Sequence, residues 1–585
     1  MNKFMIDGDQ FLMNDEPFRI VSGAMHYFRV PREYWRDRLL KIKACGFNTV
    51  ETYTAWNLHE PIEGTFDFSD NLDLQAYLDL IGELGMFAIV RPGPYICSEW
   101  EFGGLPWWLL RYNGLQIRCM NDLYLEKVSA YFSRLIPIIA SRQTDCGGPV
   151  IMVQIENEYG SYGNDSAYIQ TLGDMLETYG ITCPLFTSDG ASDAMLSGGT
   201  VDNYLAACNF GSKAGVNFKA LRKFRGKKEP LMCAEFWNGW FDHWGERHHR
   251  RSAEDAAKEL DEVLKLADGV SVYMMHGGTN FGWMNGANCS EEQYEPTVSS
   301  YDDDAPINEY GGLTEKYEAF RRLLAQYGHE NAMDLPESDP PAAYPTLAFT
   351  ECADLLDNLD LLAQPVETVT PLSMEQLGQG YGFICYTTLI KGPKEKQTLY
   401  MDANDRAYIF ADGEFLGIYY RNDKKQKISL DVPEDGVVLT ILVENMGRTN
   451  YGPLMMQRKG IVGNVRLGNQ ILYHWKTYCL PLDNLQAAQF GEPKKFRFNK
   501  RPQLLRASFT VEGRISDTFV LLPGFKKGMI FVNDRPLSRY WEIGPQHSAY
   551  LPAAWLKEGI NTITVLELEG YKKTEVEFSA QPDIG

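Results

Sequence analysis

Short apolar runs alternate with amphipathic stretches over residues 1–330 of the 585-residue chain. Each run ends in polar or glycine-rich sequence, which is typical of a buried strand followed by a loop. Between the runs, apolar side chains recur at helical spacing, as in Trp35, Leu39 and Ile42. The eight runs cover residues 18–28, 47–57, 86–96, 150–160, 184–190, 205–211, 230–240 and 270–281.

Eight strand–helix units predict an α/β fold, a (β/α)8 TIM barrel of parallel strands inside a ring of helices. In four of these units a glycine stands between the helical stretch and the apolar run that follows it, at Gly46, Gly85, Gly180 and Gly269. A left-handed glycine at such a position would end a helix before the next strand. A doubly wound open sheet is the alternative, but no glycine-rich phosphate turn follows the first run.

The pattern changes after Tyr327. Residues 334–345 are proline-rich, and the short alternating runs beyond them indicate antiparallel strands. Two segments are echoed later, since 407–420 resembles 528–541 and 436–447 resembles 559–570. We therefore expect two all-β, jelly-roll-like sandwich domains after the barrel. The expected division is a barrel over 1–330, a linker with leading strands over 331–385, a first sandwich over 386–485 and a second over 486–585, with a charged connector at 490–502.

Composition and charge narrow the classes of partner. The net charge is −22, and an acidic surface repels both nucleic acid and anionic membranes, so we expect neither as a partner. No apolar run reaches the roughly 18 residues of a membrane span. Asp7 and Asp9 interrupt the apolar stretch that a secretory signal would need. The 11 cysteines include no CxxC pair, so we expect a reduced, cytoplasmic protein.

Polar side chains gather where the predicted strands end, which is the face of a barrel that carries active sites. Glu156, Asn157 and Glu158 follow the fourth run, and Glu235 ends the seventh, nearly opposite across the barrel mouth. Two carboxyl groups so placed suit glycoside cleavage, which needs one proton donor and one carboxylate. Because strand side chains alternate, Glu156 and Glu158 share a face and the spacing cannot choose between them. A bulge would bring Asn157 to the pocket.

Five long motifs give the barrel a family resemblance. With them the chain resembles glycoside hydrolase family 35, the β-galactosidases, in which a central barrel precedes jelly-roll β-domains. The resemblance implies a retaining exo-β-galactosidase that removes terminal β-D-galactose from an oligosaccharide or glycan without a cofactor, and a second sandwich of galactose-binding type. The motifs are TYTAWNLHEP (52–61), RPGPYICSEWEFGGLPWWL (91–109), QIENEYGSYG (154–163), AEFWNGWFDHWG (234–245) and HGGTNFGWMNGA (276–287).

The resemblance also implies a role for individual residues. Glu158 matches the family's acid/base and Glu235 matches its nucleophile. Asn157 matches the residue expected to hold the sugar 2-hydroxyl. Three further matches are expected to line the galactose pocket, namely Tyr53, Glu99 and Tyr301.

Aromatic side chains are expected to complete the substrate site. Trp237 and Trp240 flank the nucleophile and are candidates for stacking on a sugar ring. Trp237 and Trp283 stand where some relatives have Tyr, which removes hydroxyl donors. Tyr451 is expected to reach from the first sandwich over the barrel mouth to the leaving-group sugar. Asp303 stands where relatives often carry Tyr, so the outer edge of the pocket is less defined.

Several of these residues have plainer interpretations. A buried barrel glutamate can be a structural ion-pair partner, and Glu99 could pair with Arg91, while Glu156 is expected to brace the site. His243, His248 and His249 cluster after the seventh run without a metal-binding spacing. We expect a hydrogen-bonded wall there and no metal site.

The linkage preference and the rival functions stay open at this point. The tryptophan-rich segment after the seventh run looks most like the compact bacterial branch of the family, which favours β-1,3-linked galactose such as Galβ1-3GlcNAc. One rival is another exo-glycosidase of the same barrel clan, such as an exo-β-glucosaminidase. A second is a catalytically silent carbohydrate-binding protein built from the sandwiches. The oligomeric state is undefined, with a homodimer as one alternative.

Overall fold

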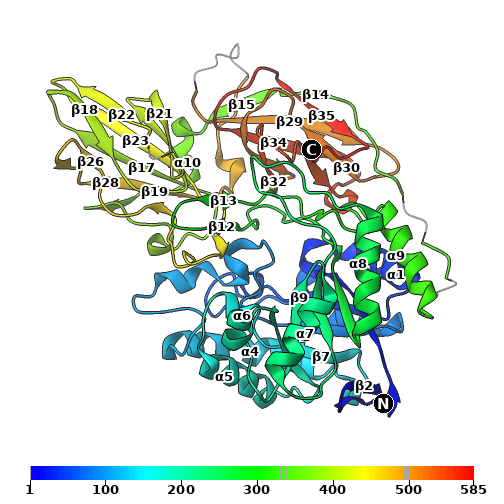
Figure 1. Ribbon diagram of the computed structural model, residues 1–585. Coiled ribbons are helices and arrows are strands. Elements are labelled where there is room, and N and C mark those ends of the chain that lie inside the picture. Colours follow the sequence, from blue (N-terminus) through cyan, green and yellow to red (C-terminus); the bar gives the residue numbers. More distant parts are fainter. Residues whose placement is uncertain (1, 330–332, 337–338, 424, 493–499) are drawn as a thin grey trace.

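A closed barrel of eight parallel strands forms the N-terminal half of the protein (Figure 1). The computed structural model describes residues 2–329, 333–336, 339–423, 425–492 and 500–585. The barrel order is β10-β11-β4-β5-β6-β7-β8-β9, with one strand for each predicted run, so the (β/α)8 prediction is confirmed and the open sheet is excluded. The strands are β4 (Ile20–Met25), β5 (Thr49–Tyr53), β6 (Phe87–Arg91), β7 (Val150–Gln154), β8 (Leu185–Gly190), β9 (Leu205–Phe210), β10 (Met232–Trp237) and β11 (Gly269–His276).

A helix follows each barrel strand, and a short helix, α2 (Trp56–His59), lies in the loop after β5. Three of the four predicted glycine stops are confirmed, with left-handed φ of 110° at Gly46, 69° at Gly85 and 111° at Gly180. The prediction for Gly269 is wrong, because α8 ends before it and Gly269 starts β11, where neighbouring side chains leave little room for a Cβ. The helices are α1 (Trp35–Cys45), α3 (Leu74–Glu83), α4 (Asp122–Ala140), α5 (Ser166–Thr178), α6 (Asp193–Gly199), α7 (Ala214–Arg225), α8 (Ala253–Leu266) and α9 (Glu315–Gln326).

An N-terminal sheet closes the bottom of the barrel. It consists of β1 (Phe4–Asp7), β2 (Gln10–Met13) and β3 (Glu16–Pro17). Phe4 and Phe11 belong to one apolar cluster with barrel side chains that include Ile89, Ile151 and Phe186. The amino-terminal end of the barrel is therefore packed shut, and the opposite end is left for a site.

The first β-sandwich pairs a six-stranded sheet, β16-β28-β17-β23-β20-β21, with a four-stranded sheet, β22-β18-β26-β27. A small pair, β19 with β25, and a short helix, α10 (Leu359–Leu362), accompany them. The strands are β16 (Val366–Thr368), β17 (Phe383–Ile390), β18 (Lys394–Tyr400), β19 (Ala403–Asn404), β20 (Arg406–Ala411), β21 (Glu414–Tyr420), β22 (Ile428–Val432), β23 (Val437–Glu444), β25 (Gly460–Ile461), β26 (Arg466–Leu467), β27 (Gln470–Ile471) and β28 (Trp475–Leu480).

The second β-sandwich pairs the sheet β15-β29-β34-β31-β32 with the sheet β14-β35-β30-β33. Its first two strands precede the first sandwich in the chain, so the first sandwich lies between two parts of the second. The strands are β14 (Leu347–Ala348), β15 (Glu351–Asp354), β29 (Gln503–Val511), β30 (Thr518–Leu521), β31 (Lys527–Val532), β32 (Arg535–Trp541), β33 (Ser548–Leu551), β34 (Gly559–Glu567) and β35 (Glu575–Ser579).

The internal echo reflects matched hairpins. In the β20–β21 pair the register shifts between Ile409 and Phe410, and in the β31–β32 pair it shifts between Ile530 and Phe531. Each hairpin then pairs with the second echoed strand, β23 or β34. The prediction of two related all-β domains is confirmed. The expected connector at 490–502 falls mostly outside the described residues, as does a small part of the proline-rich stretch at 334–345.

Both sandwiches sit over the open end of the barrel (Figure 1). The strand β24 (Thr449–Tyr451) pairs with β12 (Ala287–Cys289), which itself pairs with β13 (Tyr294–Pro296) from a barrel loop. Arg448, next to β24, forms buried ion pairs with Glu101 at 2.7 Å and Glu375 at 2.5 Å. The barrel mouth is thus partly built from the β-region. Among the described residues, no helix combines the length and apolar character that crossing a bilayer requires.

Candidate active site

A pocket opens at the carboxyl ends of the barrel strands and collects most of the predicted site. Both predicted catalytic glutamates line it, with six of the eight predicted binding residues. Trp283 and Tyr451 are the two that do not. The lining residues are Tyr53, Cys97, Ser98, Glu99, Asn157, Glu158, Glu235, Trp237, Gly239, Trp240, Phe241, Tyr273, Tyr301 and Asp303.

Glu235 stands near the end of β10 among three hydrogen-bond donors. Tyr53 Oη donates to Oε1 at 2.9 Å, Arg91 Nη2 donates to Oε1 at 2.6 Å, and Trp237 Nε1 donates to Oε2 at 3.0 Å. The register of β10 against both neighbouring strands shifts around Ala234, which interrupts regular alternation just before this residue. Donors of this kind stabilise negative charge on a carboxylate. Although Trp237 stands where some relatives have Tyr, its indole N–H still supplies a hydrogen-bond donor at this position.

Arg91 links the nucleophile candidate to the barrel interior. Its guanidinium is fully buried, and Nη1 donates to Glu51 at 2.8 Å. Nη2 reaches both Glu235 and Asn157 Oδ1 at 2.6 Å. The alternative in which Arg91 pairs with Glu99 is therefore wrong, because the guanidinium binds Glu51, Glu235 and Asn157 instead. The single positive charge of Arg91 is shared between two buried carboxyl groups, and its Nη2 holds Asn157 in the pocket.

Glu158 has very different surroundings from Glu235. Its Oε1 accepts one hydrogen bond, from Asn209 Nδ2 on β9 at 2.9 Å. Burial and the nearby charge of Glu235 raise the pKa of Glu158 to about 7. The two carboxyl groups therefore differ in environment, which is the condition for one to act as an acid and the other as a carboxylate.

The choice between Glu156 and Glu158 is made by backbone conformation. β7 ends at Gln154, and both Glu156 (φ 56°) and Glu158 (φ 45°) are left-handed, so the period of two no longer applies. Glu156 turns away from the pocket, and Arg118 donates to its two oxygens at 2.8 Å. Glu156 braces the loop, as expected, and Glu158 faces the pocket.

Asn157 lies beside both carboxyl groups. Its Oδ1 accepts from Arg91 and from Gln154 Nε2 at 3.1 Å, and it lies 2.9 Å from the Tyr53 hydroxyl, whose single proton it shares with Glu235. Its Nδ2 has no hydrogen-bond partner within the described part of the chain. A donor fixed in this way is available to a hydroxyl of a bound sugar.

The far wall of the pocket is a chain of hydroxyl groups that ends on Glu99. Tyr301 Oη donates to Glu99 at 2.5 Å and lies 3.1 Å from the Tyr273 hydroxyl. The Arg29 guanidinium stacks 3.8 Å from the centre of the Tyr301 ring. Burial raises the pKa of Glu99 to about 7. The wall presents several donors and acceptors within a small buried space.

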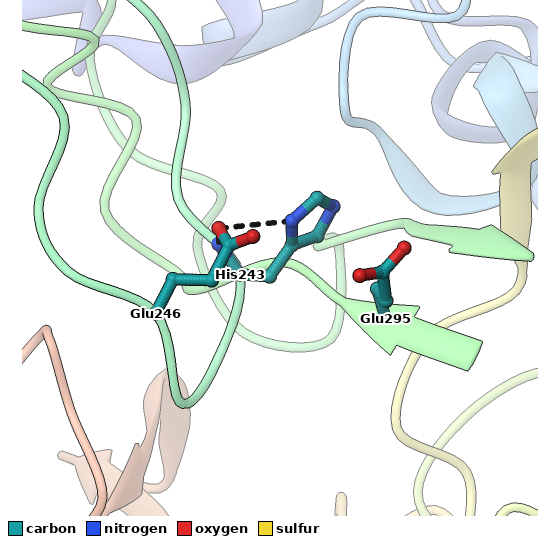
Figure 2. A group of neighbouring side chains, drawn as sticks. All are labelled: His243, Glu246 and Glu295. Atoms are coloured by element: carbon teal, nitrogen blue, oxygen red, sulfur yellow. Dashed lines mark hydrogen bonds and ion pairs between the residues drawn. The ribbon is translucent and has the colours of Figure 1, made fainter. Parts of the chain in front are cut away.

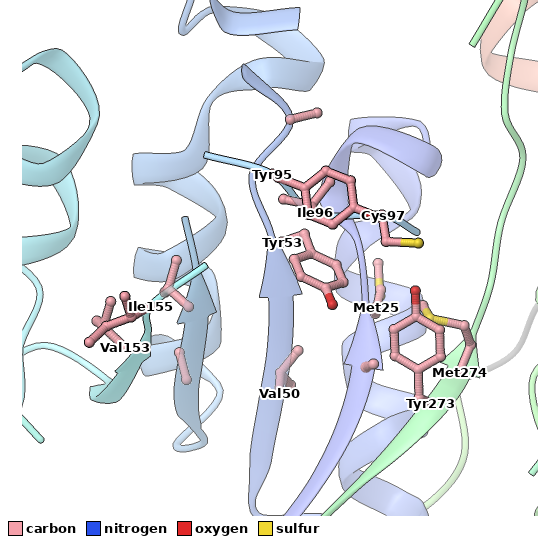
Figure 3. Packing of buried hydrophobic residues seen from close by; sticks show 14 of the residues in the cluster. Met25, Val50, Tyr53, Tyr95, Ile96, Cys97, Val153, Ile155, Tyr273 and Met274 are labelled. Carbon is pink, nitrogen blue, oxygen red and sulfur yellow. The ribbon is translucent and has the colours of Figure 1, made fainter. Parts of the chain in front are cut away.

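Six pocket residues are not among those expected from the sequence, namely Cys97, Ser98, Gly239, Phe241, Tyr273 and Asp303. Figure 3 shows Tyr53, Cys97 and Tyr273 gathered at one end of the barrel strands. Cys97 and Ser98 lie inside the motif at 91–109, so their position could have suggested them. Tyr273 lies inside β11, before its end at His276, so the strand-end rule does not point to it. Asp303 was noted only as a departure. Burial, together with the charge of Glu99, raises the pKa of Asp303 well above its usual value.

Trp283, expected from the sequence to contact substrate, does not line the pocket. Its side chain is 7% exposed and lies in an apolar cluster shared by the two sandwiches. Its ring packs edge-on against Phe383 and Phe531, with the Arg539 guanidinium 5.0 Å from its centre. Trp283 anchors the loop after β11 to the β-region and does not reach the pocket.

Tyr451 lies at the edge of the barrel mouth rather than in the pocket lining. It ends β24, pairs in register with Asn288 of β12, and is 39% exposed. Burial and the charge of Glu158 raise the pKa of Tyr451, and its hydroxyl also interacts with Ser161. Tyr451 is therefore close to the acid/base candidate, on the open side of the site.

The histidines after β10 bind carboxylates. Nδ1 of His248 and Nδ1 of His249 lie 2.7 and 2.9 Å from the carboxylate of Asp242. Such bonds are those of a polar wall under the aromatic segment Trp240–Phe241. They stiffen the loop that carries this segment.

One group in the described part of the chain has the spacing of a metal site: His243 and Glu246 from the loop after β10, and Glu295 on β13 (Figure 2). One ligand atom from each lies within 4.8 Å of the others. Glu246 binds Nδ1 of His243 at 3.0 Å, and Nε2 has no partner within the described residues. A zinc-type ion uses such ligands, but none of the three lines the pocket, so an ion there would not touch the substrate.

Comparison with known proteins gives a consistent match over the whole chain. Residues 10–327 match "Glycosyl hydrolases family 35", residues 371–482 match "Beta-galactosidase, first all-beta domain", and residues 502–561 match "Beta-galactosidase, galactose-binding domain". The chain is 39% identical to "Beta-galactosidase-1-like protein 2" of Homo sapiens, over 99% of this chain and 91% of the relative. It is 37% identical to "Beta-galactosidase" of Bos taurus, over 99% and 94%. It is 35% identical to "Beta-galactosidase 1" of Dictyostelium discoideum, again over 99% and 94%.

Proposed function

Because the chain belongs to glycosyl hydrolase family 35, we propose that Glu235 is the nucleophile and Glu158 the acid/base of a retaining exo-β-galactosidase. The enzyme is a β-galactosidase that hydrolyses terminal galactose. One observation carries the assignment of roles: two carboxyl groups share one buried pocket in opposite environments. Three donors stabilise negative charge on Glu235, whereas burial holds a proton on Glu158.

The first step is glycosylation. A carboxylate oxygen of Glu235 forms a bond to the anomeric carbon while the bond from that carbon to the leaving oxygen breaks. The proton of Glu158 passes to the leaving oxygen, which departs as a neutral hydroxyl on the remaining sugar. The products are a galactosyl ester of Glu235 and ionised Glu158.

The second step releases galactose. Esterification removes the negative charge of Glu235, so the pKa of Glu158 falls and the ionised group can act as a base. Water gives a proton to Glu158, its oxygen bonds to the anomeric carbon, and the ester bond to Glu235 breaks. Two inversions at one carbon give net retention.

We assign the buried polar residues of the pocket to the galactose ring. The free Nδ2 of Asn157 supports contact with the 2-hydroxyl, because it sits beside the nucleophile and its own oxygen is already occupied. The linked hydroxyls of Tyr273 and Tyr301 and the carboxyl of Glu99 suit the remaining hydroxyls. Tyr53 holds Glu235 and Asn157 together, so it positions the reacting groups.

A preference for β-1,3-linked galactose is a finer part of the proposal. Trp240 lines the pocket and is 40% exposed, and Tyr451 is 39% exposed and close enough to Glu158 to feel its charge, so we assign both to the leaving sugar. Exposed aromatic side chains at these positions support selection among linkages, and the proposal is that they favour a β-1,3-linked leaving sugar. Comparing kcat/KM for Galβ1-3GlcNAc and lactose tests this part, and equal values would remove it.

The mechanism is tested by NMR of the first product. A retaining enzyme acting on a β-galactoside releases β-galactose first, which then mutarotates; α-galactose as the first product would refute double displacement. Glu235→Gln is expected to abolish turnover while the pocket still binds galactose. A panel of nitrophenyl glycosides separates this proposal from an exo-β-glucosaminidase, and absence of turnover on every glycoside would leave a binding protein.

A further inference from the structure

A second hollow adjoins the catalytic pocket and has no place in the mechanism above. It is an open groove of about 660 Å³, lined on one side by Trp237, Gly239 and Trp240. The same three residues line the catalytic pocket. The opposite side consists of the loop after β9 and the first turns of α7 and α8. We name this feature the Trp240 groove.

The groove lies on the leaving-group side of the pocket. Asn209 on β9 binds Glu158, the residue that protonates the leaving oxygen. The chain continues directly from Asn209 through Phe210 to Lys213, and these following residues line the groove. A sugar chain that leaves the pocket past Glu158 and crosses Trp240, which lines both hollows, would enter the groove.

The groove is preformed. Arg251 Nη1 donates to the carbonyl oxygens of Gly211 at 2.8 Å and Trp237 at 2.7 Å, and so ties the two sides together. Arg251 Nε also donates to Asp255 at 2.8 Å. Binding of a ligand would therefore cost little free energy for ordering the protein, because the groove is already ordered.

One wall offers an aromatic surface with a free face. Trp240 is 40% exposed, while its neighbours Trp237 (5.5 Å, 80° between planes) and Phe241 (5.1 Å, 25°) hold its orientation. A rigid indole held in this way suits the C–H face of a pyranose ring. The other wall presents the side chains of Lys213 and Asp255, both exposed, which suit sugar hydroxyls.

The charge of the groove points to a neutral ligand. Two cations, Lys213 and Arg251, face two anions, Asp255 and Glu259, so no excess of either sign is present. A groove built for sialylated or sulfated sugars would carry unpaired cations. Hydroxyl-rich, uncharged sugar units fit this surface best.

We propose that the Trp240 groove binds the sugar units of a neutral oligosaccharide that lie beyond the residue bearing the terminal galactose. The inference rests on the proposed function, since it uses Glu158 to define the leaving-group side. It makes the enzyme one that prefers the end of a longer glycan to a free disaccharide. Each filled subsite contributes binding that a disaccharide lacks.

The test compares two substrates with the same scissile end, Galβ1-3GlcNAc and Galβ1-3GlcNAcβ1-3Galβ1-4Glc. The expected ratio of kcat/KM, tetrasaccharide to disaccharide, is about tenfold, the gain from one modest subsite. The double change Lys213→Met and Asp255→Ala is expected to bring the ratio close to one. Lys219→Met with Glu254→Ala is the matched control, because these exposed residues lie on α7 and α8, close to Lys213 and Asp255 in sequence but outside the groove lining.

The outcomes separate the two proposals. If neither substrate is cleaved, nor the β-1,4-linked pair of the same lengths, the proposed function fails. If the disaccharide is cleaved and the wild-type ratio is one, the groove inference is overturned while the mechanism stands. A raised ratio that the groove variant and the control change equally also overturns it.

Discussion

Asn209 Nδ2 lies 2.9 Å from Oε1 of Glu158, so the acid/base candidate on the loop after β7 is held by an amide two strands away on β9. The amide is itself oriented by Ser188, whose hydroxyl donates to Asn209 Oδ1. An N–H donor favours the ionised carboxyl and opposes burial, which raises the pKa of Glu158 to about 7. The working pH range of the enzyme follows from this balance.

Loss of the Asn209 amide should extend activity to higher pH. Glu158 must carry a proton in the free enzyme, so kcat/KM of the native protein should fall as pH rises above about 7. Asn209→Ala removes a donor to the ionised form, so the pKa rises and the alkaline limb moves upward. Profiles of kcat/KM from pH 5 to 9 check this, with the exposed Asn203→Ala as the control. A limb that moves downward would contradict the assignment of Glu158.

Glu158→Gln should lose activity in proportion to the basicity of the leaving group. General acid catalysis contributes roughly 10²- to 10⁴-fold, so a disaccharide should lose about that much in kcat/KM. A dinitrophenyl galactoside needs no proton on leaving and should lose far less. Glu156→Gln is the control, because Glu156 binds Arg118 outside the pocket and should show no such dependence. Equal losses on both substrates would argue against an acid role.

Arg118→Ala should destabilise the barrel. The change leaves Glu156 buried without its guanidinium partner, which costs about 3–5 kcal/mol. Arg36→Ala breaks an exposed pair with Glu83 and should cost no more than about 1 kcal/mol. Urea unfolding followed by circular dichroism measures both. Similar midpoints for the two variants would show that the Arg118 pair is not structural.

Trp283 and Trp240 should behave in opposite ways. Trp283→Ala empties a packed core between the sandwiches and should cost about 3–5 kcal/mol of stability, with little change in KM for nitrophenyl galactoside. Trp240→Ala should leave stability nearly unchanged because the side chain is 40% exposed, and should raise KM for disaccharides. Thermal melts and steady-state kinetics on both variants separate the roles. A raised KM for folded Trp283→Ala would restore it as a substrate residue.

Tyr451→Ala should weaken the binding of disaccharides more than the binding of nitrophenyl galactoside. Its ring lies on the open side of Glu158, where a leaving sugar would sit, so several-fold higher KM is expected for Galβ1-3GlcNAc. Tyr473→Ala removes another exposed tyrosine of the first sandwich and serves as the control. An unchanged KM for disaccharides would show that Tyr451 does not contact the substrate.

The barrel could be predicted because its signals are local. Each strand run ends in polar residues, and parallel strands in a barrel bring those ends to one face. Glu158, Glu235, Asn157 and Tyr53 therefore meet as expected. The family resemblance supplied the choice of Glu158 over Glu156. The structure gives the physical reason: both residues have left-handed φ angles, which the alternation of side chains along a regular strand cannot reveal.

The missed residues depend on contacts that are distant in sequence. Cys97 and Ser98 reach the pocket because they and the expected residue Glu99 are successive left-handed residues, a conformation that side-chain preference does not predict. Trp283 packs outside the pocket because its partners Phe383 and Phe531 come from two later domains. Nothing near Trp283 in the sequence distinguishes a sugar platform from a core residue.

The order of strands in the second sandwich has a consequence for synthesis. Glu351 on β15 pairs with Arg506 on β29, and Leu347 on β14 pairs with Val576 on β35, so both early strands leave the ribosome long before their partners. At about 5–20 residues per second the wait is on the order of ten seconds, during which the first sandwich can fold. Both waiting strands are very short and expose few unpaired backbone groups. Because β14 and β15 are so short, the nascent chain offers little strand edge for pairing with other nascent chains on the same messenger RNA.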